Sequence, residues 1–228
     1  MHIINICHIN SFELLHILNI CHIFVLLNQT HENMSLKNTS TTSDFLNWND
    51  MMLLIHRLYR DEKYRMSLLI GAGCFFGLRI SDLLSLTWEM ILDKETFVIY
   101  EKKTGKRREI KINVHFRNHI KECFTSLNIV EKNEKCFLSA KKKVYSTQRI
   151  NVLLKEIKVD YKIKIENFST HSLRKTFGRR VVDGAGINSE FALIKLSELF
   201  NHTSVMTTRR YLGLRAEEML ETYDLLEY

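Results

Sequence analysis

The chain has 228 residues, of which 45% are hydrophobic and 26% charged, enough for one full domain with a sizeable core and an appendage. Its longest apolar stretch, residues 17–27, is much shorter than the ~20 residues of a membrane-spanning helix, and no Lys or Arg precedes it. Both features argue against a membrane protein and against a secretory signal. The five cysteines are odd in number and include no Cys-x-x-Cys pair, so we expect a cytoplasmic protein rather than a disulfide framework.

The formal net charge is +7 and is unevenly distributed along the chain. Residues 1–45 contain one lysine and three carboxylates, which sum to −2, so residues 46–228 carry +9. A basic domain suits a polyanion such as DNA, because each neutralised phosphate releases counterions. An ordinary basic soluble protein explains the charge equally well, so charge alone does not identify a ligand.

Residues 1–43 differ in composition from the rest and are rich in Ile, His, Asn and Cys. The pentapeptide Asn-Ile-Cys-His-Ile occurs at 5–9 and again at 19–23, but its spacing matches no zinc-finger pattern, so we expect no metal there. The segment is expected to form a marginal amphipathic helix or to be poorly ordered, unless translation begins at Met34. Residues 35–43 are polar and are predicted to be a linker, which places the globular domain at residues 44–228.

Apolar spacing from residue 44 onward predicts a mainly α-helical α+β domain with a small antiparallel β-sheet. A first helix is expected over residues 45–60, capped by Ser43 or Asp44, and a second over 62–76, ending near Gly77. A third helix covers 80–88. Two strands, 96–102 and 107–114, flank a Thr-Gly-Lys sequence typical of a hairpin turn. Further helices are predicted over residues 116–126, 146–158, 171–183, 190–199, 204–211 and 215–226.

Arg79 stands just before the helix predicted over residues 80–88, and Asp82 follows on the same helical face. A guanidinium in this place is able to bind a phosphate through two hydrogen bonds, and a nearby carboxylate is able to hold it there. Taken alone, the pair fits an ordinary surface ion pair better.

The predicted hairpin has a basic tip, formed by Lys102, Lys103, Lys106, Arg107 and Arg108. A basic two-stranded ribbon is able to enter a DNA groove, and a lysine on it is able to donate a proton to a leaving oxygen. A solvated basic turn remains the simpler explanation for these residues alone.

His171 and Arg174 lie three residues apart, so they share one face near the start of the helix predicted over 171–183, where Ser169 or Thr170 is a suitable N-cap. The N-terminal end of a helix attracts a phosphate before any side chain contributes. Further along, His202 precedes Tyr211 by nine residues, and Tyr211 falls near the end of a short helix. A structural role explains either His171 or Tyr211 in isolation, since the chain has eight tyrosines.

Taken in order, these segments supply Arg, Lys, His-x-x-Arg, His and Tyr, which resembles the catalytic set of the tyrosine recombinase (phage integrase) family. The resemblance covers roughly residues 45–228 and is most specific in the His-x-x-Arg element and the His-to-Tyr spacing. It implies six catalytic residues: Arg79, Lys103, His171, Arg174, His202 and Tyr211. Lys103 is chosen because it opens the family's Lys-Thr-Gly turn, and Asp82 is expected to support Arg79. The residues expected to contact DNA are Lys102, Lys106, Arg107, Arg108, Lys175, Arg179 and Arg209.

The resemblance also implies an activity: a site-specific recombinase of integrase or invertase type, which cuts and rejoins double-stranded DNA through a 3′-phosphotyrosine intermediate. That intermediate keeps the energy of the broken bond, and arginines supply the positive charge, so we expect no cofactor, metal or ATP. Four strand exchanges imply a homotetramer on DNA, with the last helix docked either on a neighbouring protomer or on its own domain. A type IB topoisomerase-like enzyme and a catalytically weak or partner-dependent DNA-binding remnant remain as alternatives.

Three departures from the family pattern bear on these expectations. Phe200-Asn201-His202 stands where the family often has Leu-Gly-His. The interval from Arg174 to His202 is long, which predicts an enlarged loop over residues 184–189. Only the atypical segment 1–43 precedes the domain, whereas most members carry a helical core-binding domain there, so the chain resembles a catalytic domain alone or a truncated protein.

Overall fold

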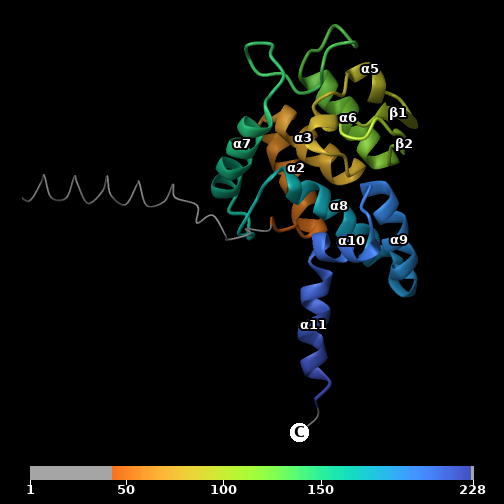
Figure 1. The fold of residues 1–228 in the computed structure, drawn as a ribbon. Helices are drawn as coiled ribbons and strands as arrows, with labels where there is room; N and C mark the ends of the chain where they lie inside the picture. The colour runs from red at the N-terminus through yellow and green to blue at the C-terminus, as the bar shows by residue number, and fades with distance from the viewer. Residues whose placement is uncertain (1–42, 227–228) are drawn as a thin grey trace, which may run out of the picture. The chain divides into compact units, whose positions relative to one another are not determined.

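The computed structural model describes residues 43–226 (Figure 1). Its first elements are helices α2 (Trp48–Arg60), α3 (Tyr64–Phe76), α4 (Ile80–Leu83) and α5 (Trp88–Ile91), then strands β1 (Thr96–Tyr100) and β2 (Arg107–Lys111). Next come α6 (Val114–Ser126), α7 (Thr147–Asp160), α8 (Thr170–Ala185), the 3-10 turn η1 (Gly186–Asn188), α9 (Ser189–Phe200), α10 (Val205–Leu212) and α11 (Leu214–Asp224). The predicted fold class, mainly helical α+β with a small antiparallel sheet, is confirmed.

The expectations for the atypical N-terminal segment, its repeated pentapeptide and a start at Met34 concern residues outside this described range. Among residues 43–226, no helix is both long and apolar enough to cross a membrane. Three of the five cysteines fall in this range, and all three are buried free thiols: Cys74, Cys123 and Cys136.

Helix α3 lies at the centre of the main core because it is apolar on nearly every side. Ten of its 13 residues are buried, and α2, α6 and α8 pack around it. Gly71 and Gly73 allow this close packing, since a Cβ atom would lie 2.5 Å from the Phe116 ring at Gly71 and 2.8 Å from the Leu173 side chain at Gly73. The helix ends at Gly77, whose φ of 57° is left-handed and favours glycine. Close contact between α3 and α8 therefore brings Arg174, the neighbour of Leu173, beside the turn that precedes Arg79.

The two strands form an antiparallel hairpin in which Thr96 pairs with Lys111 and Tyr100 with Arg107. Phe97, Ile99 and Ile110 point into the core, as expected from the two-residue period of a strand. Both strands are shorter than predicted. The first ends at Tyr100 because the turn begins at the next residue, where the Glu101 carbonyl accepts hydrogen bonds from Thr104 and Gly105.

The single helix predicted over residues 80–88 is wrong: the segment forms two four-residue helices, α4 and α5. Between them the backbone pairs with a distant segment, because Cys136 N–H donates to the Leu86 carbonyl and Trp88 N–H to the Glu134 carbonyl. These long-range hydrogen bonds replace the helical ones, while Trp88 becomes fully buried.

The beginning of α2 also differs from the prediction. Asn47, rather than Ser43 or Asp44, caps the helix by accepting a hydrogen bond from Asn49 N–H at 2.9 Å. The Asp44 carboxylate instead accepts hydrogen bonds from the backbone of Glu166 and Asn167, and so ties the entry of the domain to the segment before α8.

Helices α8, α9 and α10 pack around a second, smaller core, which contains Val182, Leu193, Leu196, Phe200 and Leu212. The enlarged loop predicted over residues 184–189 is absent from this region. Helix α8 continues to Ala185 and the single turn η1 leads directly into α9, so the long interval between Arg174 and His202 consists of helix. This small core fixes the segment that carries His202 and Tyr211 against α8.

Helix α11 leaves this core after Gly213 and runs away from α10 (Figure 1). Its apolar side chains are largely exposed: Met219 by 60%, Leu220 by 69% and Tyr223 by 70%. Of the two predicted arrangements of the last helix, packing of this apolar side on its own domain is therefore not observed.

Candidate active site

The turn after α3 and the start of α8 bring two guanidinium groups together. Arg79 precedes α4 and donates from Nη1 to Glu101 Oε2 at 2.7 Å and from Nη2 to the Phe200 carbonyl at 2.9 Å. Arg174, on α8, donates to the Gly77 carbonyl at 2.5 Å and to the same Phe200 carbonyl at 3.3 Å. We call Arg79 and Arg174 the arginine pair. Burial lowers the pKa of Arg174 to about 10, which leaves its guanidinium charged at neutral pH.

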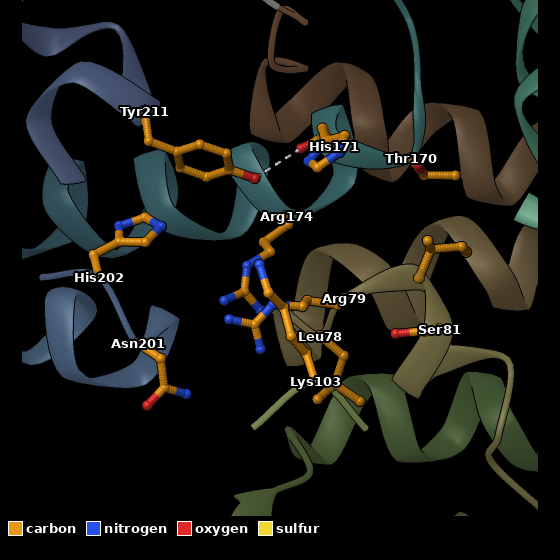
Figure 2. Close-up of a pocket in the computed structure, with 11 residues that line it drawn as sticks. Leu78, Arg79, Ser81, Lys103, Thr170, His171, Arg174, Asn201, His202 and Tyr211 are labelled. Atoms are coloured by element: carbon orange, nitrogen blue, oxygen red, sulfur yellow. Dashed lines mark hydrogen bonds between the residues drawn. The ribbon is translucent and has the colours of Figure 1, made fainter. Parts of the chain in front are cut away.

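Tyr211 lies at the end of α10, with its phenol directed toward the start of α8 (Figure 2). Its hydroxyl donates to the His171 carbonyl at 3.5 Å, and the Lys175 ammonium lies 5.4 Å from its ring centroid. Burial raises the pKa of Tyr211 to about 12, although Arg174 and Arg79 act to lower it. The phenol is therefore protonated at neutral pH and needs a base to become a nucleophile.

His202 follows Asn201, the left-handed C-cap of α9 with a φ of 53°. Its Nδ1 contacts the hydroxyl of the buried Thr208 at 2.9 Å, which leaves Nε2 for a substrate, and its ring centroid lies 5.3 Å from that of Tyr211. Burial, and then Arg174 and Arg79, lower the pKa of His202. His171, in the first turn of α8, also has a lowered pKa, caused by burial and by Arg174 and Lys175. Both histidines are thus neutral at pH 7 and able to accept a proton.

These side chains line one cavity of about 350 Å³, together with Lys103 from the hairpin. Figure 2 shows the arginine pair at its centre, Tyr211 and His202 on one side, and Lys103 on another. The structure thus brings together all six residues that the sequence predicts as catalytic, although they span positions 79 to 211. The rest of the lining consists of Leu78, Ile80, Ser81, Thr170 and Asn201.

Asp82 donates a backbone hydrogen bond to the Arg79 carbonyl, but its carboxylate does not hold the Arg79 guanidinium, contrary to the sequence expectation. Its Oδ1 accepts hydrogen bonds from Lys102 N–H at 2.9 Å and from the Ser81 hydroxyl at 3.4 Å, and the side chain is fully buried. The carboxylate that holds Arg79 is Glu101, which sequence reasoning missed. Glu101 continues the inward-facing alternation of Phe97 and Ile99, so a charged residue at a buried strand position was the available signal.

Four of the basic residues expected at DNA contact other residues of the chain instead. Arg108 donates to the Phe76 carbonyl at 2.8 Å, and only 9% of its side chain is exposed. Lys175 donates to the Ser43 carbonyl, and Arg179 pairs with Glu217 at 2.6 Å. Arg209 pairs with Glu190 at the surface. Lys102, Lys106 and Arg107 are exposed on the hairpin and remain candidates for DNA contact.

Within residues 43–226, no group of three or more histidine, cysteine or acidic side chains is placed to hold a metal ion.

The fold is that of tyrosine recombinase catalytic domains. The structure is similar to XerA recombinase, with a TM-score of 0.58 and 20% identity over 81% of this chain and 66% of that chain. It is also similar to the XerH site-specific recombinase bound to its palindromic difH substrate, with a TM-score of 0.59 and 20% identity over 85% of this chain and 58% of that one. The Tn1549 transposon integrase in complex with transposon right end DNA gives a TM-score of 0.57 and 17% identity, covering 82% of this chain and 68% of that one.

The sequence comparisons agree with the fold. The model of the phage integrase family matches residues 45–218, and this chain belongs to that family. A probable integrase/recombinase, YoeC of Bacillus subtilis (strain 168), is 30% identical over 156 residues, which cover 66% of this chain and 78% of that protein. The chain spans less than two thirds of XerA and XerH.

Proposed function

We propose that this protein is a site-specific recombinase that cuts and rejoins double-stranded DNA through a covalent 3′-phosphotyrosine link at Tyr211. The observation that carries this proposal is the convergence of a tyrosine, two neutral histidines and a lysine on the arginine pair in one cavity. Membership of the phage integrase family supports the same reaction class.

In the proposed cleavage step, the scissile phosphate binds to the arginine pair, which stabilises the charge that develops on the non-bridging oxygens. The Tyr211 oxygen forms a bond to phosphorus, and its proton passes to His202 or His171. The bond from phosphorus to the 5′ oxygen breaks, and the Lys103 ammonium donates a proton to that oxygen. Rejoining reverses each transfer, so the bond energy is conserved and ATP is not consumed.

Contact with DNA is assigned to three exposed basic residues of the hairpin: Lys102, Lys106 and Arg107. They belong to the same hairpin as Lys103, which lines the cavity. The similar XerH and Tn1549 structures hold DNA, which supports duplex DNA as the partner. We further propose that residues 44–228 form the catalytic domain, that it acts as a homotetramer on two DNA sites, and that it does so in the cytoplasm, where its buried thiols stay reduced.

Trapping of the covalent intermediate tests this function. Nicked duplexes tiled across the DNA that flanks the gene are incubated with the protein and resolved on a denaturing gel. We expect a covalent adduct that Tyr211→Phe abolishes and that Tyr223→Phe, an exposed position on α11, leaves unchanged.

Three other outcomes contradict this proposal. An adduct that persists in Tyr211→Phe shows that Tyr211 is not the nucleophile. Relaxation of supercoiled plasmid without any specific site indicates a topoisomerase-like enzyme, and tight binding without cleavage, unchanged in Tyr211→Phe, indicates a DNA-binding remnant.

A further inference from the structure

Glu101 is a carboxylate in an unusual place, at the end of β1 on the face that packs into the core. Only 1% of its side chain is exposed. A buried carboxylate destabilises a fold unless hydrogen bonds and opposite charges surround it. The contacts that Glu101 makes therefore indicate why the chain retains it.

A single oxygen, Oε2, accepts three hydrogen bonds, each from a different segment of the chain. The donors are Arg79 Nη1 at 2.7 Å, Asn201 Nδ2 at 2.8 Å and the Thr104 hydroxyl at 2.9 Å. The other oxygen lies 3.7 Å from the Arg108 guanidinium. Burial alone would raise the pKa of Glu101, but the hydrogen bonds from Arg79 and Thr104, together with the positive charges of Arg79 and Arg108, hold the pKa below its usual range. The group is therefore an anion at neutral pH.

Each of the three donors belongs to, or directly adjoins, a residue of the proposed catalytic set. Arg79 is a member of the arginine pair. Thr104 follows Lys103 in the hairpin turn, and Asn201 precedes His202. One buried carboxylate thus connects three of the segments that line the cavity.

Asn201 strengthens this connection. Its left-handed backbone, with a φ of 53°, favours glycine or asparagine. Asparagine satisfies the same backbone requirement and adds an amide that reaches Glu101, which glycine lacks.

We propose that Glu101 is a positioning residue for the recombination reaction. It holds Arg79, the Lys103 turn and the His202 segment in fixed positions relative to one another. This role rests on the proposed function, because it concerns the alignment of those three groups around the scissile phosphate. Glu101 touches no reacting atom and acts only through its three donors.

Single-turnover cleavage of a nicked duplex tests this role. The variants are Glu101→Gln, Thr104→Val and Asn201→Gly, of which the last keeps a residue suited to the left-handed backbone. Glu109→Gln is the matched control, because Glu109 lies on β2 of the same hairpin with its side chain 55% exposed. Thermal unfolding and DNA affinity are measured in parallel. We expect Glu101→Gln to slow cleavage by about tenfold or more while its DNA affinity stays near wild type, and Glu109→Gln to behave as wild type.

Two modified duplexes separate positioning from a merely structural role. One has sulfur in place of the bridging 5′ oxygen, a leaving group that needs no proton from Lys103. The other has a neutral methylphosphonate at the scissile position, which reduces the demand on Arg79. We expect the bridging sulfur to relieve most of the Thr104→Val defect, and each modified duplex to relieve part of the Glu101→Gln defect.

Several results would overturn the proposal. Cleavage by Glu101→Gln at the wild-type rate shows that the carboxylate is dispensable, and a defect of equal size on all three duplexes shows that it is only structural. If Glu101→Gln does not fold, wild-type rates in both Thr104→Val and Asn201→Gly overturn it. If the wild-type protein forms no adduct on any duplex, the proposed function itself fails.

Discussion

At the scale of single residues, the protonation states of Tyr211 and the two histidines set the chemistry. A phenol with a pKa of about 12 does not ionise by itself near neutral pH, so cleavage depends on a neutral base. The pKa values of His202 and His171 are lowered from 6.5, mainly by burial, so their neutral forms persist to more acidic pH than that of an ordinary histidine.

This arrangement predicts the pH profile of cleavage. We expect the single-turnover rate to be level near neutral pH and to fall on an acid limb whose apparent pKa lies below 6.5, because protonation removes the base. His202→Gln and His171→Gln, measured over the same pH range, identify the base as the residue whose loss removes the limb. An acid limb above 6.5 contradicts the prediction.

The six candidate catalytic residues were predictable from the sequence because their types, order and spacing form a pattern along the chain. Glu101 belongs to no such pattern, since its donors Arg79 and Asn201 are 22 and 100 residues away. The wrong prediction that some basic residues, such as Arg108, contact DNA has a related cause. Whether Arg108 faces solvent or the Phe76 carbonyl depends on tertiary contacts that charge alone does not reveal.

At the scale of secondary structure elements, the contact between α3 and α8 determines where Arg174 lies. Gly73→Ala places a methyl group 2.8 Å from Leu173, the residue before Arg174, and so forces the two helices apart. We expect the free energy of unfolding to fall by about 1–3 kcal/mol in urea titrations. We also expect the cleavage rate to fall at temperatures where the variant remains folded.

Gly184→Ala is the control for this change, because an added Cβ at Gly184 meets nothing within 4 Å. This variant should be as stable as wild type or up to about 1 kcal/mol more stable, since alanine favours a helix over glycine. Equal stability of Gly73→Ala and wild type would show that the two helices adapt without strain.

Most helices were predictable to within a few residues because each has an apolar periodicity of its own. The segment over residues 80–88 was not, since its hydrogen-bond partners Glu134 and Cys136 lie about fifty residues further along the chain. The end of α8 was not predictable for another reason. Gly184 and Gly186 suggest a loop, but the helix continues to Ala185.

At the scale of the whole molecule, α11 presents an apolar side that its own domain leaves exposed. Packing on a neighbouring protomer is the remaining one of the two predicted arrangements. We expect the double variant Leu220→Gln, Tyr223→Gln to unfold with a free energy within about 0.5 kcal/mol of wild type, because both side chains are exposed.

The same variant should form the covalent adduct on a single nicked site but should lose the tetrameric protein–DNA complex, measured by native gel and by light scattering. Glu221→Gln, an exposed neighbour on α11, serves as the control and should keep the tetramer. A tetramer that survives the double variant shows that α11 does not hold the protomers together.

The Phe200 carbonyl affects how much entropy the arginine pair loses when a DNA phosphate binds. It lies at the C-terminal end of α9, where the helix carries partial negative charge, and both members of the arginine pair donate to it. Two long cationic side chains would otherwise repel each other and sample many rotamers. Because they are already ordered before DNA arrives, little rotamer entropy is lost when a phosphate binds, and more of the binding free energy remains to favour the transition state.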